Sequence, residues 1–343
     1  EQYPALIRAA EAPVIDTASA AVLKLSQLIR EHGFKVALTG QGADELLAGY
    51  VWFKTSSMME RLNIVPGLTN GLRRLYTRFV TPNYPWKDII GHMQSLGGRY
   101  NAAFDAFGRV FTPRFDFYSA EMKDRIVDYS SFAEMGLNRD RMSQWAPLNQ
   151  GLYLTSRTLL SGMLLSSKGD RACMNASVEM RHPFLDEDLF DFCAKLHPRW
   201  KLRGLRDKFL LRTVADKWLP KQMSRRRKAM FLTPWESLCP NGSAGPTYVE
   251  ELLSEESLRR AGYFNPANVA KWRSDVRSLR RGSLLRTSIE MSLVGVVSTQ
   301  LWHHSFIDGS LASLSSQAGT YPQLQSHPIE LRSSSMEPVG ISQ

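Results

Sequence analysis

Apolar residues recur at helical spacing in several parts of this chain. Within residues 17–33, Val22, Leu25 and Leu28 fall on one face of a helix. Thr17 is placed to cap the start of that helix, and Gly33 suits the position just after its end. The same spacing predicts further helices over residues 149–165, 189–196, 208–218 and 286–302. Residues 62–112 are rich in Gly, Pro and aromatic side chains, which favours loops and short helices.

A continuous apolar run follows the first predicted helix. Val36, Ala37 and Leu38 predict a short buried strand over residues 34–38. A glycine-containing loop and a second helix come next, and this order is typical of an α/β domain. We therefore predict an α/β fold, with a parallel sheet flanked by helices and a helical C-terminal part.

Composition narrows the class of protein. The chain has 343 residues, of which 43% are hydrophobic and 22% charged, so it is neither wholly disordered nor collagen-like. Three scattered cysteines cannot form a disulfide framework, and no apolar run reaches the length of a membrane span. With no signal peptide visible, we expect a cytoplasmic protein that does not bind membranes.

The charge balance and the end of the chain add two expectations. Forty-three Lys and Arg residues against 33 Asp and Glu give a net charge of +10. The basic residues are spread over several segments, so we predict no nucleic-acid partner. Residues 309–343 hold nine serines, three prolines and few large apolar residues. We predict a disordered Ser-rich tail there, after a domain spanning residues 1–308.

The loop after the predicted strand is the first candidate site. Gly40 and Gly42 sit where the strand ends, and Asp44 and Glu45 open the next helix. Glycines let backbone N–H groups approach a ligand, and the carboxyl ends of parallel strands are where α/β sheets bind ligands. Asp44 could hold Mg²⁺. A plain strand-to-helix turn with an acidic helix start would use the same residues.

Three ordered blocks resemble the glutamine-hydrolysing asparagine synthetases. TGQGADELLAGY, residues 39–50, resembles the family loop S-G-E-G-S-D-E-x-x-G-G-Y. GDRACMNASVEMRHPFLDEDLF, residues 169–190, resembles the signature D-R-x-S-M-x-x-x-x-E-x-R-x-P-F-L-D. RDKFLLRTVADKWLPKQMSRRRKAMF, residues 206–231, resembles the run K-x-x-L-R…L-P…R-x-K-x-x-F. The resemblance covers roughly residues 1–308 and is weakest between 51 and 145.

The resemblance implies a carbon–nitrogen ligase that uses ATP and Mg²⁺. Such a synthetase domain converts aspartate to β-aspartyl-AMP, which ammonia then attacks to form asparagine. An N-terminal glutaminase domain supplies the ammonia from glutamine and would be the partner of this domain. The resemblance also allows a homodimer. A carboxylate becomes an electrophile only once its oxygen can leave with AMP, so the enzyme must neutralise the departing pyrophosphate.

The resemblance also implies nucleotide-binding residues. Thr39 and Gly40 match positions that contact the adenosine part of ATP, and Gln41 and Gly42 complete that loop. Asp44 matches the acid that binds Mg²⁺ on the pyrophosphate.

Three further residues match catalytic positions. Lys208 corresponds to a lysine on the transferred phosphates, Glu179 to an acid of the signature, and Tyr50 to the tyrosine that closes the loop. If these roles hold, Asp44, Glu179 and Lys208 should line one cleft at the carboxyl end of the strand. In the basic run 225–228, one or two side chains would contact pyrophosphate, whereas a solvated face is the simpler interpretation. The pair His303 and His304 is interpreted as ordinary surface or hydrogen-bonded core.

The sequence departs from the family pattern in several places. Gln41 stands where the family loop has an acid, and Ala48 replaces the first glycine of G-G-Y. Neither the pyrophosphate loop S-G-G-x-D-S nor a glutaminase domain is found in the 343 residues. We therefore expect a C-terminal part of a longer synthetase and a sheet that lacks its earlier strands. The isolated chain should show no exchange of pyrophosphate into ATP.

Two alternatives remain open at this point. A related adenylating enzyme, such as a β-lactam synthetase or a lasso-peptide cyclase, would use the same chemistry on another carboxylate. A catalytically silent remnant would keep the fold without the reaction.

Overall fold

A computed structural model describes residues 2–62, 114–129, 134–226, 228, 235, 238 and 246–311. The chain begins with five elements: α1 (Gln2–Ala10), α2 (Ala18–Glu31), β1 (Val36–Leu38), α3 (Ala43–Leu46) and α4 (Val51–Leu62). After a gap come short helices and one long helical run: α8 (Arg114–Phe117), α9 (Ala120–Ile126), α10 (Arg139–Ser143), α11 (Pro147–Thr155), the π-helical η1 (Ser156–Leu164) and η2 (Ser166–Asp170), and α12 (Arg171–Asn175).

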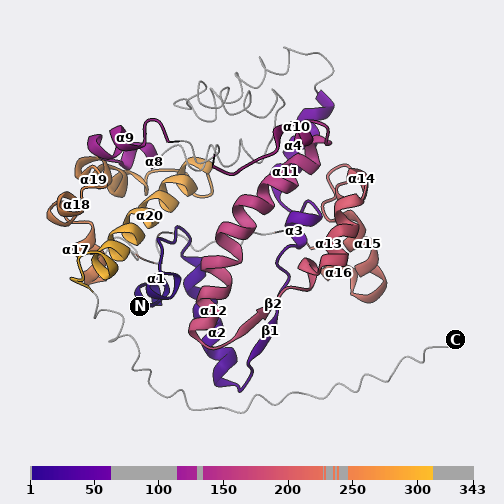
Figure 1. The fold of residues 1–343 in the computed structure, drawn as a ribbon, viewed down its shortest axis with the longest axis horizontal. Coiled ribbons are helices and arrows are strands. Elements are labelled where there is room, and N and C mark those ends of the chain that lie inside the picture. The colour runs from indigo at the N-terminus through magenta and orange to yellow at the C-terminus, as the bar shows by residue number, and fades with distance from the viewer. Residues whose placement is uncertain are drawn as a thin grey trace.

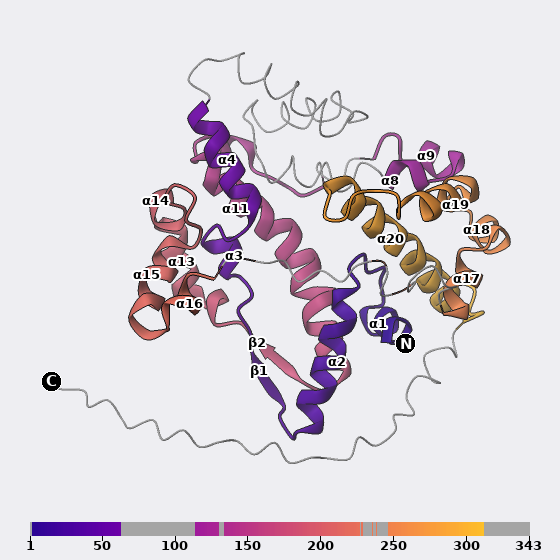
Figure 2. The same cartoon turned by 180° about the vertical axis from the view of Figure 1, so that it is seen from behind.

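The described residues of the second half of the chain form one strand and two groups of helices. The first group follows the strand: β2 (Glu179–Arg181), the 3₁₀ turn η3 (Pro183–Leu185), α13 (Glu187–Lys195), α14 (Pro198–Lys201), α15 (Phe209–Trp218) and α16 (Lys221–Ser224). The second group is α17 (Thr247–Leu252), α18 (Glu255–Ala261), α19 (Pro266–Asp275) and α20 (Leu284–Phe306). In Figures 1 and 2 the α11–η1 run lies between these two groups.

The sheet of the described residues is small and parallel. β1 pairs with β2, and Val36, Ala37 and Leu38 stand opposite Glu179, Met180 and Arg181. α2 precedes β1 and α3 follows it, so the predicted order of helix, strand, loop and helix is confirmed. The prediction of an α/β fold with a parallel sheet and a helical C-terminal part is likewise confirmed.

The expected burial of the first strand is wrong. Val36 is 40% exposed, and Leu38 is 74% exposed. An apolar run can indicate a strand from its residue types, but burial depends on what covers the strand. Here β1 pairs on one edge with β2, and the described helices leave both of these side chains open to solvent.

The largest apolar core lies where the two ends of the described chain meet. Leu6 and Ile7 of α1 share a cluster with Ile289, Leu293 and Val297 of α20, and all five are fully buried. α20 also packs against α8, α17, α18 and α19, as Figure 1 shows. This helix bundle forms a layer beside the α/β part. In the described part of the chain, no helix has the length and apolar character of a membrane span.

The predicted helices appear with small shifts at their ends. Thr17 takes the N-cap position of α2, Asp16 Oδ1 accepts from Ala18 N at 2.9 Å, and Gly33 has a φ of +82° after the helix. The segment predicted over 149–165 divides into α11 and the π-helical η1. The expectations for residues 63–112 and 312–343 lie outside the described residues.

Candidate functional site

The carboxyl ends of β1 and β2 meet at one edge of the sheet. Thr39 follows β1, and its backbone N–H donates to Arg181 O at 2.9 Å. Thr39 Oγ1 lies 2.6 Å from Nδ1 of His182, the residue that follows β2. The other ring nitrogen, His182 Nε2, is buried without a hydrogen-bond partner among the described residues. Two segments 143 residues apart thus combine at this edge, and one of them keeps an unused polar atom there.

The glycines of the loop serve different purposes. Gly42 has a φ of +89°, which is the left-handed region, and a Cβ there would lie 2.3 Å from Leu185 Cδ2. Gly42 therefore permits both the turn and the close packing of the loop on η3. At Gly40 a Cβ would meet nothing within 4 Å, so this side of the loop is open. Gln41 is half-buried, and its backbone N–H lies 3.5 Å from Thr39 Oγ1.

Asp44 lies between two lysines. Lys208 Nζ is 3.0 Å from Asp44 Oδ1, and Lys228 Nζ is 2.9 Å from Asp44 Oδ2. The lysine side chains remain 17% and 29% exposed, so both can reach a ligand. One carboxylate and two ammonium groups leave this trio, Asp44, Lys208 and Lys228, with one net positive charge. The trio is thus suited to an anion.

The position of Lys208 is held by its neighbours. Its backbone N–H donates to Leu47 O at 3.0 Å, and its φ of +49° places a non-glycine residue in the left-handed region just before α15. The preceding Asp207 is buried and pairs with Lys54 at 2.9 Å and Arg212 at 3.0 Å. Burial pushes the pKa of Asp207 upward, but the hydrogen bonds from Lys54 and Arg212 outweigh it and lower that pKa. Unusual backbone held by a surrounding network is common at functional sites.

The backbone just before Lys228 is held by hydrogen bonds from Arg212. Arg212 Nη1 donates to Ser224 O at 2.7 Å and to Arg226 O at 2.9 Å. Lys228 Nζ then lies 5.6 Å from the centre of the Tyr50 ring, within the range of a cation–π contact. The basic run 225–228 is therefore not simply a solvated face, because Lys228 turns inward to Asp44.

Tyr50 and Glu45 form a buried pair beside the trio. The Tyr50 hydroxyl donates to Glu45 Oε1 at 2.5 Å, and its ring stacks on Trp52 with centroids 4.3 Å apart. Burial raises the pKa of Glu45, although the hydrogen bond from Tyr50 opposes that effect. Burial, followed by the Glu45 charge, also raises the pKa of Tyr50. Buried contacts with Glu45 and Trp52 thus hold Tyr50, which ends the loop, in place.

The raised pKa of Glu45 predicts how stability varies with pH. The folded state holds the Glu45 proton to higher pH than the unfolded state, whose pKa is near 4.5. Stability from this group is therefore complete below that pH and is lost as pH rises through the folded pKa. Glu45→Gln keeps an acceptor for Tyr50 and removes the titration. We expect its free energy of unfolding in urea to exceed that of the unchanged chain at about pH 8.

The same comparison at about pH 4 serves as the control, because Glu45 is then mostly protonated in both states and the two proteins should differ little. Equal pH dependence of the two proteins would contradict the assignment.

Comparisons with known proteins reveal the family. The sequence profile of the family "Asparagine synthase" matches residues 1–304. The chain belongs to the asparagine synthase family. The family membership expected from the three sequence blocks is thereby confirmed.

Individual relatives are distant. The chain is 26% identical over 238 residues to the glutamine-hydrolyzing asparagine synthetase 1 of Bacillus subtilis, a match covering 68% of this chain and 36% of the relative. It is 23% identical over 269 residues to Amidase chyE of Penicillium rubens, covering 74% and 40%. Amidase chry2 of Gibberella zeae is 22% identical over 268 residues, again covering 74% and 40%. The matched region spans about two fifths of these relatives.

Within this asparagine synthase domain, the Glu179 carboxylate makes no ion pair with the trio among the described residues. Glu179 stands opposite Val36, and its backbone N–H donates to Lys35 O at 2.8 Å, which places it at the amino end of the two strands. Its exposed carboxylate pairs with Arg181 at 2.8 Å, and that hydrogen bond lowers the pKa of Glu179. The structure thus brings Asp44 and Lys208 together at one point, while Glu179 is paired elsewhere.

The sequence did not single out two residues of this site, His182 and Lys228. His182 carried no expectation, and its only signal is its place directly after the signature's arginine. Lys228 was one of several candidates in a basic run, and its spacing from Lys208 does not single it out. Ala48 has a φ of +58°, which explains why the asparagine synthase loop has glycine at that place.

Proposed function

We propose that this chain forms the synthetase site of an enzyme that activates a carboxylate with ATP and then forms an amide bond. Aspartate is the proposed substrate, and ammonia drawn from glutamine by a glutaminase domain is the proposed nucleophile. The observation that supports this most directly is the trio of Asp44, Lys208 and Lys228 beside the loop at the carboxyl end of β1. Family membership supports the use of ATP.

The charges of the trio suit the phosphates of ATP. The two ammonium groups repel a bare divalent cation but attract a phosphate chain. Phosphate oxygens would draw Lys208 and Lys228 away from Asp44, whose carboxylate would then be available to Mg²⁺. Mg²⁺ prefers one or two carboxylates together with phosphate oxygens, so the residues fit a metal that arrives with the nucleotide. The metal would supply charge neutralisation on the departing pyrophosphate.

The other residues would hold and shape the nucleotide pocket. The open side of Gly40 leaves room for the adenosine part against the loop, and Thr39, fixed by His182, would set the loop's distance from it. Gln41 and Gly42 continue that surface. Tyr50 would keep the loop end closed through Glu45 and the ring contact with Lys228. For Glu179 we propose a role toward the attacking amine, which requires its pair with Arg181 to open.

A second candidate function rests on the fungal relatives. Two of the matched proteins are named amidases, so a related reaction on a carboxylate other than aspartate is the alternative. Both functions share the nucleotide site and differ in the acceptor. Exchange of pyrophosphate into ATP that depends on aspartate favours the first function. Exchange that appears only with another carboxylic acid favours the second.

Binding of inorganic pyrophosphate to the 343-residue chain tests the anion site itself. Without Mg²⁺, we expect Lys228→Ala to weaken binding about tenfold or more, since a charge-assisted hydrogen bond contributes about 1.5–3 kcal/mol. Asp44→Asn should instead tighten Mg²⁺-free binding, because it removes the carboxylate that competes for both lysines. Isothermal titration measures both effects.

Lys195→Ala is the matched control, because Lys195 is 80% exposed and pairs with Asp191 on the surface of α13. Its affinity for pyrophosphate should equal that of the unchanged chain. No binding by the unchanged chain, or equal binding by Lys228→Ala and Lys195→Ala, would contradict the proposed site.

A further inference from the structure

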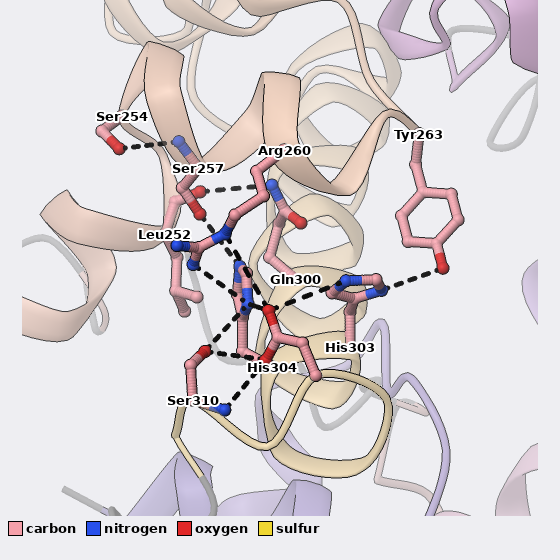
Figure 3. A network of polar contacts seen from close by, with 10 residues as sticks. Leu252, Ser254, Ser257, Arg260, Tyr263, Gln300, His303, His304 and Ser310 are labelled. Carbon is pink, nitrogen blue, oxygen red and sulfur yellow. Dashed lines mark hydrogen bonds and ion pairs between the residues drawn. The ribbon is translucent and has the colours of Figure 1, made fainter.

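A second polar cluster, which shares no residue with the trio, lies at the carboxyl end of α20. His303 and His304 occupy the last turn of this helix, and Asp308 follows its end. One ligand atom from each of the three residues lies within 4.8 Å of the others. In the described part of the chain, this is the group of His, Cys, Asp and Glu side chains that could hold a metal ion. Figure 3 shows the surroundings of the two histidines.

Each histidine has one ring nitrogen held by a hydroxyl group. Tyr263 Oη lies 3.0 Å from His303 Nδ1, and Ser257 Oγ lies 3.0 Å from His304 Nε2. Both contacts are visible in Figure 3. Hydrogen bonds of this kind orient the histidine ligands of metal sites and fix which nitrogen is left for the metal.

The remaining nitrogens point to the same carboxylate oxygen. His304 Nδ1 lies 2.6 Å from Asp308 Oδ2, and His303 Nε2 lies 3.9 Å from that atom. Zinc bonds of about 2.0–2.1 Å in a tetrahedron place ligand atoms about 3.3 Å apart. One of these distances must widen and the other must shorten, each by less than 1 Å. The planes of the two histidine rings are 90° apart.

The charges around the two histidines favour the binding of a cation that enters from solvent. The carboxyl end of a 23-residue helix carries partial negative charge, and Asp308 adds a full one. His304 is buried, while the Asp308 side chain is 29% exposed and leaves an entry path. Ser310 Oγ lies 3.2 Å from His304 Nδ1 and could provide a further oxygen ligand.

Arg260 is the feature that opposes a metal. Its Nη2 lies 3.4 Å from His304 Nδ1, and its Nε lies 3.9 Å from Asp308 Oδ2. The Arg260 side chain is 57% exposed, so it can turn into solvent when another cation takes its place. The guanidinium therefore competes with a metal ion for Asp308 without closing the site.

The same atoms also form a Ser–His–Asp row through Ser257, His304 and Asp308. A nucleophilic serine must reach a substrate, but Ser257 is 8% exposed and its Oγ contact with His304 is buried. Acyl transfer is therefore not supported here, and the ligand that fits is a small ion.

We propose that His303, His304 and Asp308 form a binding site for a divalent transition-metal ion, with zinc as the ion to test. Two imidazole nitrogens and one carboxylate are a common ligand set for zinc, and water or Ser310 would complete the tetrahedron. The site is separate from the nucleotide site and does not depend on the proposed function.

Zinc binding by the full 343-residue chain tests the proposal. After removal of metals, zinc is titrated in competition with a chromophoric chelator, and cobalt is used in parallel for its visible absorption. We expect one high-affinity ion per chain. Asp308→Asn, which keeps the shape of the side chain, should weaken binding at least about tenfold, and Tyr263→Phe should weaken it about tenfold to a hundredfold.

Two further variants sharpen the test. Arg260→Gln should tighten zinc binding because it removes the competing cation, whereas His32→Ala, on the exposed end of α2, should change nothing. Circular dichroism of each metal-free variant confirms that it is folded. Absence of zinc binding, equal affinity in Asp308→Asn and His32→Ala, or weaker binding in Arg260→Gln would each overturn the site.

Discussion

If the proposed function holds, replacing Asp44 by asparagine should abolish aspartate-dependent exchange of pyrophosphate into ATP in a synthetase that joins this domain to a glutaminase domain. The substitution removes the carboxylate that sits between Lys208 and Lys228 and would hold the metal on the pyrophosphate. Lys208→Ala should lower the same exchange by a large factor, since it removes a cation from the phosphates. The measurement follows labelled pyrophosphate into ATP with saturating aspartate.

Two controls separate this effect from misfolding. Asp191→Asn, on the surface of α13, should leave exchange unchanged, because Asp191 is 71% exposed and pairs with Lys195 across 3.8 Å. If the proposed glutaminase domain is present, its hydrolysis of glutamine should remain nearly intact in the Asp44 and Lys208 variants, because neither side chain belongs to that domain. Normal exchange in Asp44→Asn would show that the metal role belongs to another residue.

Adding a single methyl group at Gly49 should disrupt the same site. A Cβ there would lie 1.9 Å from Asp44 Oδ1 and 2.4 Å from Lys208 Cε, distances at which atoms overlap. Asp44 is short and its backbone O already accepts from Gly49 N at 2.9 Å, so it cannot simply move aside. We expect Gly49→Ala to lose about 1–3 kcal/mol of stability, the usual cost of overpacking. Exchange should fall at least about tenfold, because the ion pair is displaced.

Urea unfolding and the exchange assay together measure these two effects. Gly162→Ala is the matched control, because a Cβ at Gly162 meets nothing within 4 Å and the residue lies within a helical segment. That variant should be as stable as the unchanged chain or slightly more stable. If Gly49→Ala behaved like Gly162→Ala, the tight packing of the loop against Lys208 would be refuted.

Local pattern was sufficient to find β1 and the longer helices, but not the short elements or the environment of each element. The run at residues 36–38 predicted β1 because strand residue types are a local property. The same run predicted burial, which was wrong, because Val36 and Leu38 are covered or exposed according to the segments packed on them. The partner strand β2 lies more than a hundred residues away, and no strand was predicted there, because its residues stood out only as part of a family signature.

The candidate site shows the same division. Asp44 and Lys208 were selected by the family blocks, and the structure places their side chains 3.0 Å apart. Glu179 came from an equally clear block, yet its carboxylate is paired with Arg181 and not with Lys208 or Lys228. A block of sequence fixes which residues are near each other along the chain, but it does not say which way a side chain on a short exposed strand will turn.

By itself, the sequence determined the family, the α/β order around β1 and five helical segments, the last of which is α20. These features depend on local periodicity and on recognisable blocks. Only the tertiary structure decided that Lys228 turns inward to Asp44, that His182 supports Thr39, and that Tyr263 and Ser257 orient the two histidines after a long helix. The physical reason is that these contacts join segments distant in sequence. Their geometry follows from how helices and strands pack, and that information is spread over the whole chain.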